Sequence, residues 1–509
     1  MVPMKDNKGR FLVVSNRLPV TMTSNDNKWE AKSSSGGLVN ALDPVLKNRG
    51  GFWVGWPGTC EEVKMSVLKE ILGPISKKNG YRFMPVLLTK KDIEEYYHGF
   101  SNSVLWPLFH DFQSRCDFLP EYWEGYIRAN EKFAKVVHGH ASENDFIWVN
   151  DYQLIPLGSM LLNKNPDLRS SFFLHIPFPS LDVFMKLPWR KEILYQLTCY
   201  SLVCFQTQRD RRNFIECVRV FYPGATVYGR GHVIKVRIDD RAFLAGSMPI
   251  SIDYRRYSSL GSSGPVVKRA KQIKDEIYTE KMMIGVDRLD YSKGIPQKLK
   301  GFDKCLQEHP ELREKLTLFQ LVIPSRDTIN EYRELRNEIE LLISEINGKY
   351  STTRWTPVIW RHGSLPETEL YAAYRAADIA IVTSLKDGMN LVCKEYCASK
   401  GRKGGVLILS EFTGAAIQLS KGAVLVNPYD VCDVSESIYR AFMMDEEEQK
   451  ARMKSMREAI RRQDVFWWVD NFLRAAAGKK LGDFPEQDLP SLWPGLFKIK
   501  QKYNAGKPS

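Results

Sequence analysis

The stretch Thr383–Leu391, Thr-Ser-Leu-Lys-Asp-Gly-Met-Asn-Leu, decides the fold more than any other part of this sequence. It follows the apolar run Ile379–Thr383, which predicts a buried strand, and it leads into the helical pattern Val392–Ala398. Parallel strands are joined by helical crossovers, so a strand that passes through a polar loop into a helix predicts one unit of a parallel sheet.

The same loop has two chemical interpretations. Main-chain N–H groups at such a helix start can hold sugar hydroxyls or phosphate, and Glu395 is placed one turn into the helix to accept hydrogen bonds from a ribose. The alternative is an ordinary helix start with a solvated Glu395. Of all the motifs in the chain, this one is the most specific.

Strand–helix units recur along the chain in both directions from this stretch. The other predicted strands are short β-branched or aromatic runs at Phe11–Ser15, Phe52–Gly55, Phe146–Asn150, Ser171–His175, Leu202–Gln206, Met282–Val286, Leu318–Ile323, Val358–Arg361, Val406–Ser410 and Ala423–Val426. Amphipathic patterns such as Glu331–Ile346 and Glu367–Ala376 lie between them. This number of strand–helix units is larger than one sheet usually holds. We therefore expect an α/β protein with two doubly wound, Rossmann-like domains facing a cleft.

Turn-rich sequence near Met248–Gly264 marks the expected domain boundary. We therefore expect one domain over residues 1–250 and a second over residues 251–463. Residues 464–509 are expected to form a helix, Asp464–Ala477, and a tail. This helix is rich in aromatic residues, which is explained if it crosses back and packs on the first domain.

Composition narrows the classes of function. The chain has 509 residues, 43% hydrophobic and 26% charged, a net charge of +13 and nine cysteines without paired spacing. The basic residues are scattered, so we expect no nucleic-acid partner and favour anionic small molecules. With no apolar run near 18 residues and no signal-peptide pattern, we expect no membrane span and a cytoplasmic protein with reduced thiols. The sequence does not reveal the oligomeric state, and a homo-oligomer is compatible with it.

Two features of the first domain are suited to phosphate. Arg17 directly follows the strand Phe11–Ser15, and its planar guanidinium matches a phosphate or a carboxylate. Gly36 and Gly37 open the helical run Val39–Leu46, where backbone N–H groups and the helix dipole favour an anion. A surface arginine and a flexible turn remain the alternatives.

Aromatic residues follow the strands of the first domain. Trp56, Tyr97 and Trp106 lie in aromatic stretches, and flat rings commonly form walls for sugars. Each one alone is more often a core residue, although their clustering favours a binding role.

Four polar residues stand at predicted strand ends. Asp151 and His175 follow two strands of the first domain, where a carboxylate and an imidazole are suited to a sugar, although a core histidine is the ordinary alternative. Arg288 and Lys293 lie across one loop of the second domain. Two cations there would neutralise a leaving diphosphate, and ion pairs with Asp287 and Asp290 are the alternative.

Taken together, these motifs resemble those of the trehalose-6-phosphate synthases, retaining glycosyltransferases of family 20 with the two-Rossmann GT-B fold. The resemblance runs from about Phe11 to about Asn471. It rests on motifs that occur in one order: Ser15-Asn16-Arg17, Gly36-Gly37-Leu38, Phe100–Trp106, Asn150-Asp151-Tyr152, His175–Pro179, Arg288–Gly294, Pro324-Ser325-Arg326, Asn347–Tyr350 and Asp387–Leu391.

The resemblance implies a role for each residue. It implies a UDP-glucose donor held by Gly36, Gly37, Arg288, Lys293, Asp387, Met389, Asn390, Leu391, Val392 and Glu395. It implies a glucose 6-phosphate acceptor held by Arg17, Trp56, Tyr97, Trp106, Asp151 and Arg326, with Arg17 and Arg326 on its phosphate. His175 would contact the transferred glucose, and Asp151, His175, Arg288 and Lys293 would form the catalytic set.

The resemblance also implies a reaction on one face of the sugar, without a covalent intermediate. Near the proposed donor site the sequence offers no pair of carboxylates for double displacement and no metal-ligand set, so we expect metal-independent chemistry without a cofactor.

One motif departs from the family pattern, because Asn150 and Gln153 stand where many members carry histidines, although polar substitutes can still form hydrogen bonds. The alternatives are a glucosylglycerol-phosphate synthase using ADP-glucose and glycerol 3-phosphate, a pseudo-glycosyltransferase, and a non-catalytic sugar-phosphate sensor. Retention of Arg17, Trp56 and Tyr97 favours a hexose acceptor, and retention of Arg288 and Lys293 favours an enzyme over a sensor.

Overall fold

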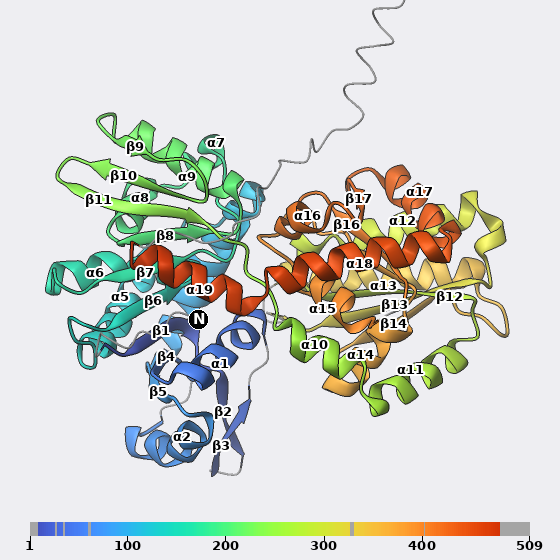
Figure 1. Ribbon diagram of the computed structural model, residues 1–509, viewed down its shortest axis with the longest axis horizontal. Helices are drawn as coiled ribbons and strands as arrows, with labels where there is room; N and C mark the ends of the chain where they lie inside the picture. Colours follow the sequence, from blue (N-terminus) through green and yellow to red (C-terminus); the bar gives the residue numbers. More distant parts are fainter. Residues whose placement is uncertain are drawn as a thin grey trace, which may run out of the picture.

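Two open sheets, each covered by helices on both faces, form the two halves of the molecule (Figure 1). The computed structural model describes residues 9–25, 28–33, 36–59, 63–325, 330–401 and 403–478. The two sheets confirm the expected α/β fold with two Rossmann-like units. We call the half built on the first sheet the first domain and the half built on the second sheet the second domain.

The first sheet has nine strands. In spatial order they are β5 (Arg82–Pro85), β4 (Phe52–Trp56), β1 (Phe11–Arg17), β6 (Phe146–Asn150), β7 (Ser170–Phe173), β8 (Leu202–Phe205), β11 (Arg241–Ser247), β10 (Val233–Ile238) and β9 (Thr226–Tyr228). Strands β5 to β11 in that order are parallel, and β10 and β9 are antiparallel additions at one edge. A separate hairpin joins β2 (Val20–Asn25) to β3 (Lys28–Ser33).

Helices of the first domain cross between these strands. They are α1 (Gly37–Arg49), α2 (Met65–Asn79), α3 (Lys90–Asp92), the π-helix η1 (Ile93–Leu105), α4 (Trp106–Phe109), η2 (Gln113–Arg115), α5 (Pro120–His138), η3 (Tyr152–Leu154), α6 (Leu157–Lys164), α7 (Leu181–Phe184), α8 (Arg190–Thr198) and α9 (Gln208–Phe221).

The second sheet has six parallel strands. In spatial order they are β14 (Val358–His362), β13 (Leu316–Ile323), β12 (Lys281–Arg288), β15 (Ile379–Val382), β16 (Val406–Ser410) and β17 (Val424–Val426). The helices after the first sheet are α10 (Tyr254–Gly261), α11 (Gly264–Ile277), η4 (Tyr291–Lys293), α12 (Ile295–Glu308), η5 (Pro310–Leu312), α13 (Asn330–Tyr350), α14 (Glu367–Ala376), α15 (Val392–Ser399), α16 (Gly414–Leu419), α17 (Val431–Met443), α18 (Glu446–Arg462) and α19 (Val465–Ala476).

Burial explains why these segments are strands. The central strands are covered on both faces, and every residue of β15 and β16 is buried. Such strands appear in a sequence as continuous apolar runs rather than as alternating patterns. The predicted boundary at residue 250 falls between the end of β11 and the start of α10.

The last described helix returns to the first domain, as the sequence predicts. In Figure 1, α18 lies across the second domain and α19 across the first. The Trp148 ring of β6 lies 4.1 Å from the Phe472 ring and 4.9 Å from the Trp468 ring, centroid to centroid. The Val465 N–H donates to the Ile252 carbonyl at 3.0 Å, so the two connections between the domains run side by side.

The π-helix η1 is an element that the sequence does not predict. Its wide turn shows in the backbone bond from the Trp106 N–H to the Ser101 carbonyl, five residues earlier. The side chain of Asn102 also donates to the Tyr97 carbonyl at 2.7 Å. Such helices are rare and often occur at functional sites. This one carries Tyr97 and ends at Trp106, two residues of the predicted acceptor pocket.

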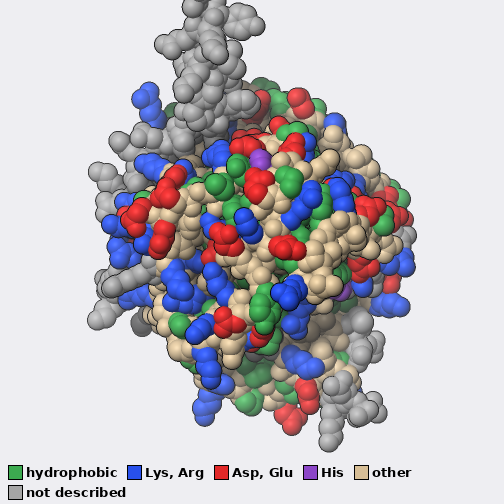
Figure 2. Space-filling model, turned by 90° about the vertical axis from the view of Figure 1, so that its right-hand side faces the viewer, with side chains coloured by type: hydrophobic (Ala, Val, Ile, Leu, Met, Phe, Trp, Pro, Cys, Tyr) green, Lys and Arg blue, Asp and Glu red, His purple; other side chains and the backbone are tan. Residues whose placement is uncertain are grey.

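The surface and the thiols agree with the composition. On the face shown in Figure 2, basic and acidic side chains are interspersed rather than gathered in one stripe. Six of the eight described cysteines are buried, and the structure gives these eight as free thiols. Among the described residues, we find no helix that is long and apolar enough to cross a membrane.

Candidate active site

Two loops of the second domain meet at the carboxyl ends of neighbouring strands. Arg288 ends β12, Lys293 lies in η4 in the connection that follows, and the loop after β15 carries Asp387. The Leu385 N–H donates to the Ser292 carbonyl at 2.7 Å, which ties the two loops together. Gly294 has a φ of 62°, and a Cβ there would lie 2.1 Å from the Thr383 carbonyl, so only glycine fits.

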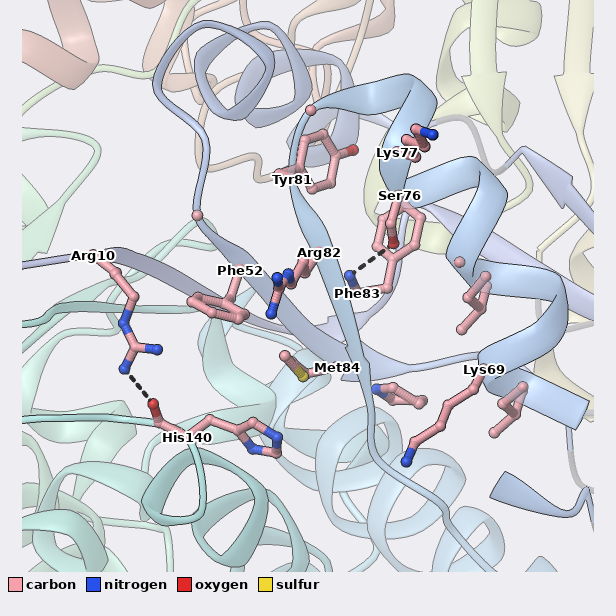
Figure 3. Close-up of a pocket in the computed structure, with 16 residues that line it drawn as sticks. Arg10, Phe52, Lys69, Ser76, Lys77, Tyr81, Arg82, Phe83, Met84 and His140 are labelled. Carbon is pink, nitrogen blue, oxygen red and sulfur yellow. Dashed lines mark hydrogen bonds between the residues drawn. The ribbon is translucent and has the colours of Figure 1, made fainter. Parts of the chain in front are cut away.

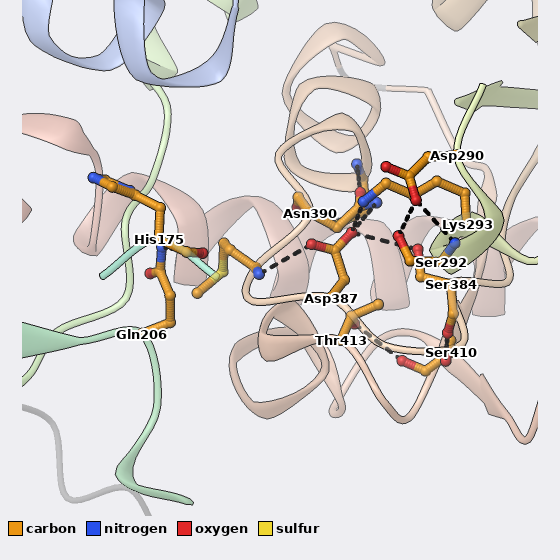
Figure 4. A network of polar contacts seen from close by, with 12 residues as sticks. His175, Gln206, Asp290, Ser292, Lys293, Ser384, Asp387, Asn390, Ser410 and Thr413 are labelled. Atoms are coloured by element: carbon orange, nitrogen blue, oxygen red, sulfur yellow. Dashed lines mark hydrogen bonds and ion pairs between the residues drawn. The ribbon is translucent and has the colours of Figure 1, made fainter. Parts of the chain in front are cut away.

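Lys293 and Asp387 form the central ion pair of these loops. Lys293 Nζ lies 2.6 Å from Asp387 Oδ2, and Asn390 Nδ2 donates to the same oxygen at 3.3 Å (Figure 4). Burial works to raise the pKa of Asp387, but the charge and hydrogen bond of Lys293 outweigh it, and the pKa lies below its ordinary value. The pair is therefore charged and sits at the cleft, where the sequence predicts donor-binding residues.

Glu395 accepts hydrogen bonds from two tyrosines. Its carboxylate oxygens lie 3.2 Å from the hydroxyl of Tyr257 on α10 and 3.2 Å from that of Tyr374 on α14. Burial raises the pKa of Glu395 even though both hydroxyls oppose the rise. The sequence did not predict these partners, because they depend on how α10 packs against α14 and α15.

The first domain contributes Asp151 and His175. Asp151 has a φ of 78° and accepts from the N–H groups of Tyr152, at 3.0 Å, and His175, at 3.2 Å. Burial raises the pKa of Asp151 to about 6, against the opposing effects of these N–H groups and of the charge of Arg288. The carboxylate is thus near a cation from the other domain.

Asn150 holds the imidazole of His175. Its Oδ1 lies 3.0 Å from His175 Nε2, while its Nδ2 faces the Trp148 carbonyl at 3.2 Å. Because Oδ1 can only accept, Nε2 carries the hydrogen and Nδ1 is the acceptor of the ring. Burial lowers the pKa of His175 to about 3, so the ring is neutral. The substitution of Asn for the family's histidine therefore keeps a hydrogen-bond partner for His175.

The loops of the two domains touch across the cleft. A Cβ on Gly388 would lie 2.2 Å from the His175 carbonyl, so glycine permits this approach. Gly36 precedes α1 and Gly37 begins it, as predicted, and a Cβ on Gly37 would lie 3.0 Å from Leu391 Cδ1. The predicted donor residues from both domains are therefore brought together.

Three predicted acceptor residues also form one cluster. The Arg17 guanidinium carbon lies 4.5 Å from the Trp56 ring centroid and 5.6 Å from that of Tyr97, and the two rings are 6.0 Å apart. Trp106 lies further along, with the Arg288 guanidinium carbon 5.4 Å from its ring. Trp56 and Trp106 are buried, whereas Tyr97 is half-buried.

His110 belongs to this region, although no pattern in the sequence pointed to it. Its ring centroid is 4.2 Å from that of Trp106, and Nδ1 lies 2.8 Å from the Trp106 carbonyl. Burial lowers the pKa of His110 to about 4, with opposing effects from Asp290 and Asp387. The ring is therefore neutral, with Nδ1 as donor and Nε2 as acceptor.

Some predictions lie beyond this geometry. Arg326 falls outside the described residues. Within the described ranges, no three His, Cys, Asp or Glu side chains are grouped so as to hold a metal ion.

A cavity of about 780 Å³ lies at the amino ends of β4 and β5, lined by Phe52, Lys69, Arg82 and others (Figure 3). It is at the end of the sheet opposite the residues above, and ligands of open α/β sheets gather at the carboxyl ends.

The sequence profile of glycosyltransferase family 20 matches residues 9–477 of this chain. The chain belongs to glycosyltransferase family 20. Within family 20, it is 40% identical over 469 residues to the alpha,alpha-trehalose-phosphate synthase [UDP-forming] A of Dictyostelium discoideum, with 92% of this chain matching 62% of that protein. It is also 40% identical over 474 residues to the trehalose-6-phosphate synthase of Mycobacterium tuberculosis strain H37Rv, with 92% of this chain matching 94% of that protein.

Solved structures share the family 20 fold. An alpha,alpha-trehalose-phosphate synthase from Burkholderia xenovorans in complex with glucose-6-phosphate superposes with a TM-score of 0.82 at 32% identity, covering 92% of this chain and 100% of that one. An E. coli structure bound with UDP-2-fluoro glucose gives a TM-score of 0.81 at 32% identity, covering 92% and 99%. The expected fold and family are confirmed, and the chain is placed among glycosyltransferases.

Proposed function

We propose that the chain transfers glucose from UDP-glucose to glucose 6-phosphate and forms α,α-trehalose 6-phosphate and UDP. The relatives that carry this activity in their names span nearly the whole chain. One observation supports the proposal most: the Lys293–Asp387 pair, with Arg288 beside Asp151, lies where cations and hydrogen-bonding loops of both domains converge.

In the proposed reaction, each side of the cleft binds one anion. The donor diphosphate binds Arg288 and Lys293, and the transferred glucose lies between the Asp387–Leu391 loop and His175. Glu395 takes the ribose, as an alternative to its hydrogen bonds with Tyr257 and Tyr374. Gly36, Gly37 and Val392 complete the donor side.

Arg17 binds the acceptor phosphate from the other side, with Arg326 as its predicted partner. Trp56, Tyr97 and Trp106 form the wall for the hexose ring, and Asp151 holds its hydroxyls. The aromatic wall beside Arg17 favours a hexose acceptor over glycerol 3-phosphate, because the smaller acceptor would leave the rings of the wall without a packing partner.

The proposed chemistry proceeds on one face of the glucose ring. The bond from C1 to the diphosphate oxygen breaks, and a bond from C1 to the acceptor hydroxyl oxygen forms on the same side. The hydroxyl proton goes to the departing phosphate, while Arg288 and Lys293 stabilise the charge that develops there. The step needs neither a covalent glucosyl-enzyme nor a metal, and both statements stay predictions. We also expect the reaction to run in the cytoplasm.

A product assay tests the proposal. The protein is incubated with UDP-, ADP- or GDP-glucose and with glucose 6-phosphate or glycerol 3-phosphate, and products are identified by mass spectrometry and NMR. From UDP-glucose and glucose 6-phosphate we expect a disaccharide phosphate with a single glycosidic linkage that is α at both anomeric carbons. A β-linked product would overturn the retaining mechanism, and preferred use of glycerol 3-phosphate would overturn the proposed acceptor.

A further inference from the structure

A short segment of the first domain reaches the nucleotide-sugar side of the cleft. This segment, Trp106–Cys116, is called the bridging segment here. The Phe112 ring lies 5.0 Å from the Tyr291 ring of the second domain, and the Arg115 guanidinium carbon lies 4.8 Å from the same ring. Asp111 pairs with Lys386. The Arg288 guanidinium lies over the Trp106 ring, so these second-domain partners, Arg288, Tyr291 and Lys386, lie at the end of β12 or in the connections that follow β12 and β15.

The backbone of the bridging segment is held in one shape. Asp111 has a φ of 67°, a left-handed conformation that aspartate and asparagine tolerate better than most residues. The Phe112 N–H donates to the Pro107 carbonyl at 2.8 Å, and the Asp111 N–H donates to the Leu108 carbonyl at 3.1 Å. The backbone at Asp111 is therefore fixed relative to that of Trp106, whose ring forms part of the predicted acceptor wall.

On the other side, Lys386 immediately precedes Asp387. Its side chain is only 17% exposed, although it carries a charge, and its amine faces carboxylates of the first domain. Asp111 is one of them, and Asp210 at the start of α9 is near enough for the Lys386 charge to oppose the rise that burial causes in the Asp210 pKa. Tyr429 also lies near Asp111.

We propose that Asp111 and Lys386 are positioning residues, whose ion pair sets the donor loop Thr383–Leu391 against the acceptor wall. This inference rests on the proposed function. The pair spans the cleft but touches neither predicted substrate. It therefore acts by favouring the arrangement in which Asp387 and Lys293 face the first domain. A partly exposed pair shifts such an equilibrium by a small factor, about two- to five-fold.

A double-mutant cycle tests the pair. Asp111→Asn keeps the left-handed backbone accessible and removes the charge, and Lys386→Gln removes its partner. We expect each single variant to raise the KM for UDP-glucose about two- to five-fold, with a smaller effect on kcat. The double variant should be no worse than either single one, because the interaction is lost once. High salt should raise the wild-type KM toward that of the variants.

Two controls make the result specific. Glu340→Gln breaks the exposed ion pair with Arg336 on α13 of the second domain. This change should leave both the KM for UDP-glucose and kcat unchanged. The free energy of unfolding of the three variants, measured in denaturant, should match that of the wild type. If the pair had a purely structural role, its loss would lower the free energy of unfolding rather than raise the KM. Additive single effects, or an unchanged KM in both singles, would overturn the inference. The same cycle is measured for UDP binding by calorimetry, which requires no turnover and so separates this inference from the proposed reaction.

Discussion

At the scale of single residues, Lys293 combines two functions in one amine. It neutralises Asp387 at 2.6 Å, and it lies in the loop proposed to hold the donor diphosphate. We expect Lys293→Ala to lower kcat by about 10²–10³-fold, because a preorganised charge at the leaving group is lost. The measurement is UDP release at saturating substrates.

Lys300→Ala is the matched control for this change. Lys300 lies on α12 and pairs with Glu338 at 3.2 Å on the surface, so its loss should leave kcat unchanged. Circular dichroism and thermal unfolding show whether the Lys293→Ala protein is folded. A folded Lys293→Ala enzyme with wild-type turnover would contradict the role of Lys293.

The raised pKa of Asp151 leads to a prediction about how the stability of the protein depends on pH. Its pKa in the folded protein, about 6, lies above the ordinary aspartate value near 4, mainly because of burial. The stabilisation from its protonated form is complete below the unfolded-state pKa and is lost as pH rises through about 6. At pH 8, Asp151→Asn should therefore raise the free energy of unfolding by about 1–2 kcal/mol while lowering activity.

Urea unfolding of both proteins between pH 4 and pH 8 checks this prediction. The stability difference should shrink strongly toward pH 4, because the wild-type carboxyl is then protonated in the folded protein and about half protonated in the unfolded chain. Asparagine keeps an acceptor for the Tyr152 and His175 N–H groups and tolerates the positive φ. A variant that is less stable than the wild type at pH 8 would contradict a destabilising charge at Asp151.

The sequence predicted positions of site residues better than their contacts. Asp387 and Lys293 were both expected at strand ends of the second domain, and parallel topology brings such ends to one edge. By contrast, the partners of Glu395 and the stacking of His110 on Trp106 arise from tertiary packing between segments that carry no shared pattern. Asn150 is a departure from the family pattern in the sequence, and in the structure its Oδ1 keeps the imidazole of His175 in one tautomer.

At the scale of elements, α19 is the part whose loss should be most costly. Trp468 is fully buried and packs on Trp148 and on Phe173, the latter at 5.1 Å between centroids. We expect Trp468→Ala to lower the free energy of unfolding by about 3–5 kcal/mol, through lost burial and the cavity that remains. Because the same ring lies 6.1 Å from that of His175, activity should also fall.

Arg474→Ala on the same helix provides the comparison for Trp468→Ala. Its pair with Asp470 is a surface contact within one helix, so the change should cost less than about 0.5 kcal/mol. Chemical denaturation of both variants gives the two values. Equal destabilisation by the two substitutions would show that α19 does not depend on its buried face.

Elements were predictable where burial leaves a pattern in the sequence. The runs for β6 and β16 match the structure to the residue, because fully covered strands are continuous apolar stretches. The edge strands β5 and β9, the inner strands β10 and β11 beside β9, and the hairpin β2–β3 were missed, since partly exposed strands mix polar residues with apolar ones. The π-helix η1 was also missed, because its sequence has no periodic pattern that separates a π-helix from an α-helix.

At the scale of the whole molecule, two domains supply positive charge to one cleft. Arg17 comes from the first domain and Arg288 and Lys293 from the second, so the charge of both substrates is met by side chains. We therefore expect kcat to be the same in excess EDTA as in added Mg²⁺. Metal-stripped enzyme is assayed with and without the ion, and an EDTA loss that Mg²⁺ restores would contradict metal-independent turnover.

The crossing of α19 has a consequence for synthesis of the protein. About 200 residues separate the last strand of the first sheet from the helix that covers Trp148 and Phe173. At roughly 5–20 residues per second, a ribosome needs about 10–40 s to make that stretch. During this time the nascent first domain presents an aromatic patch that only a later part of its own chain can cover. Slow translation of the second domain therefore prolongs the period in which chaperones or aggregation compete for the first.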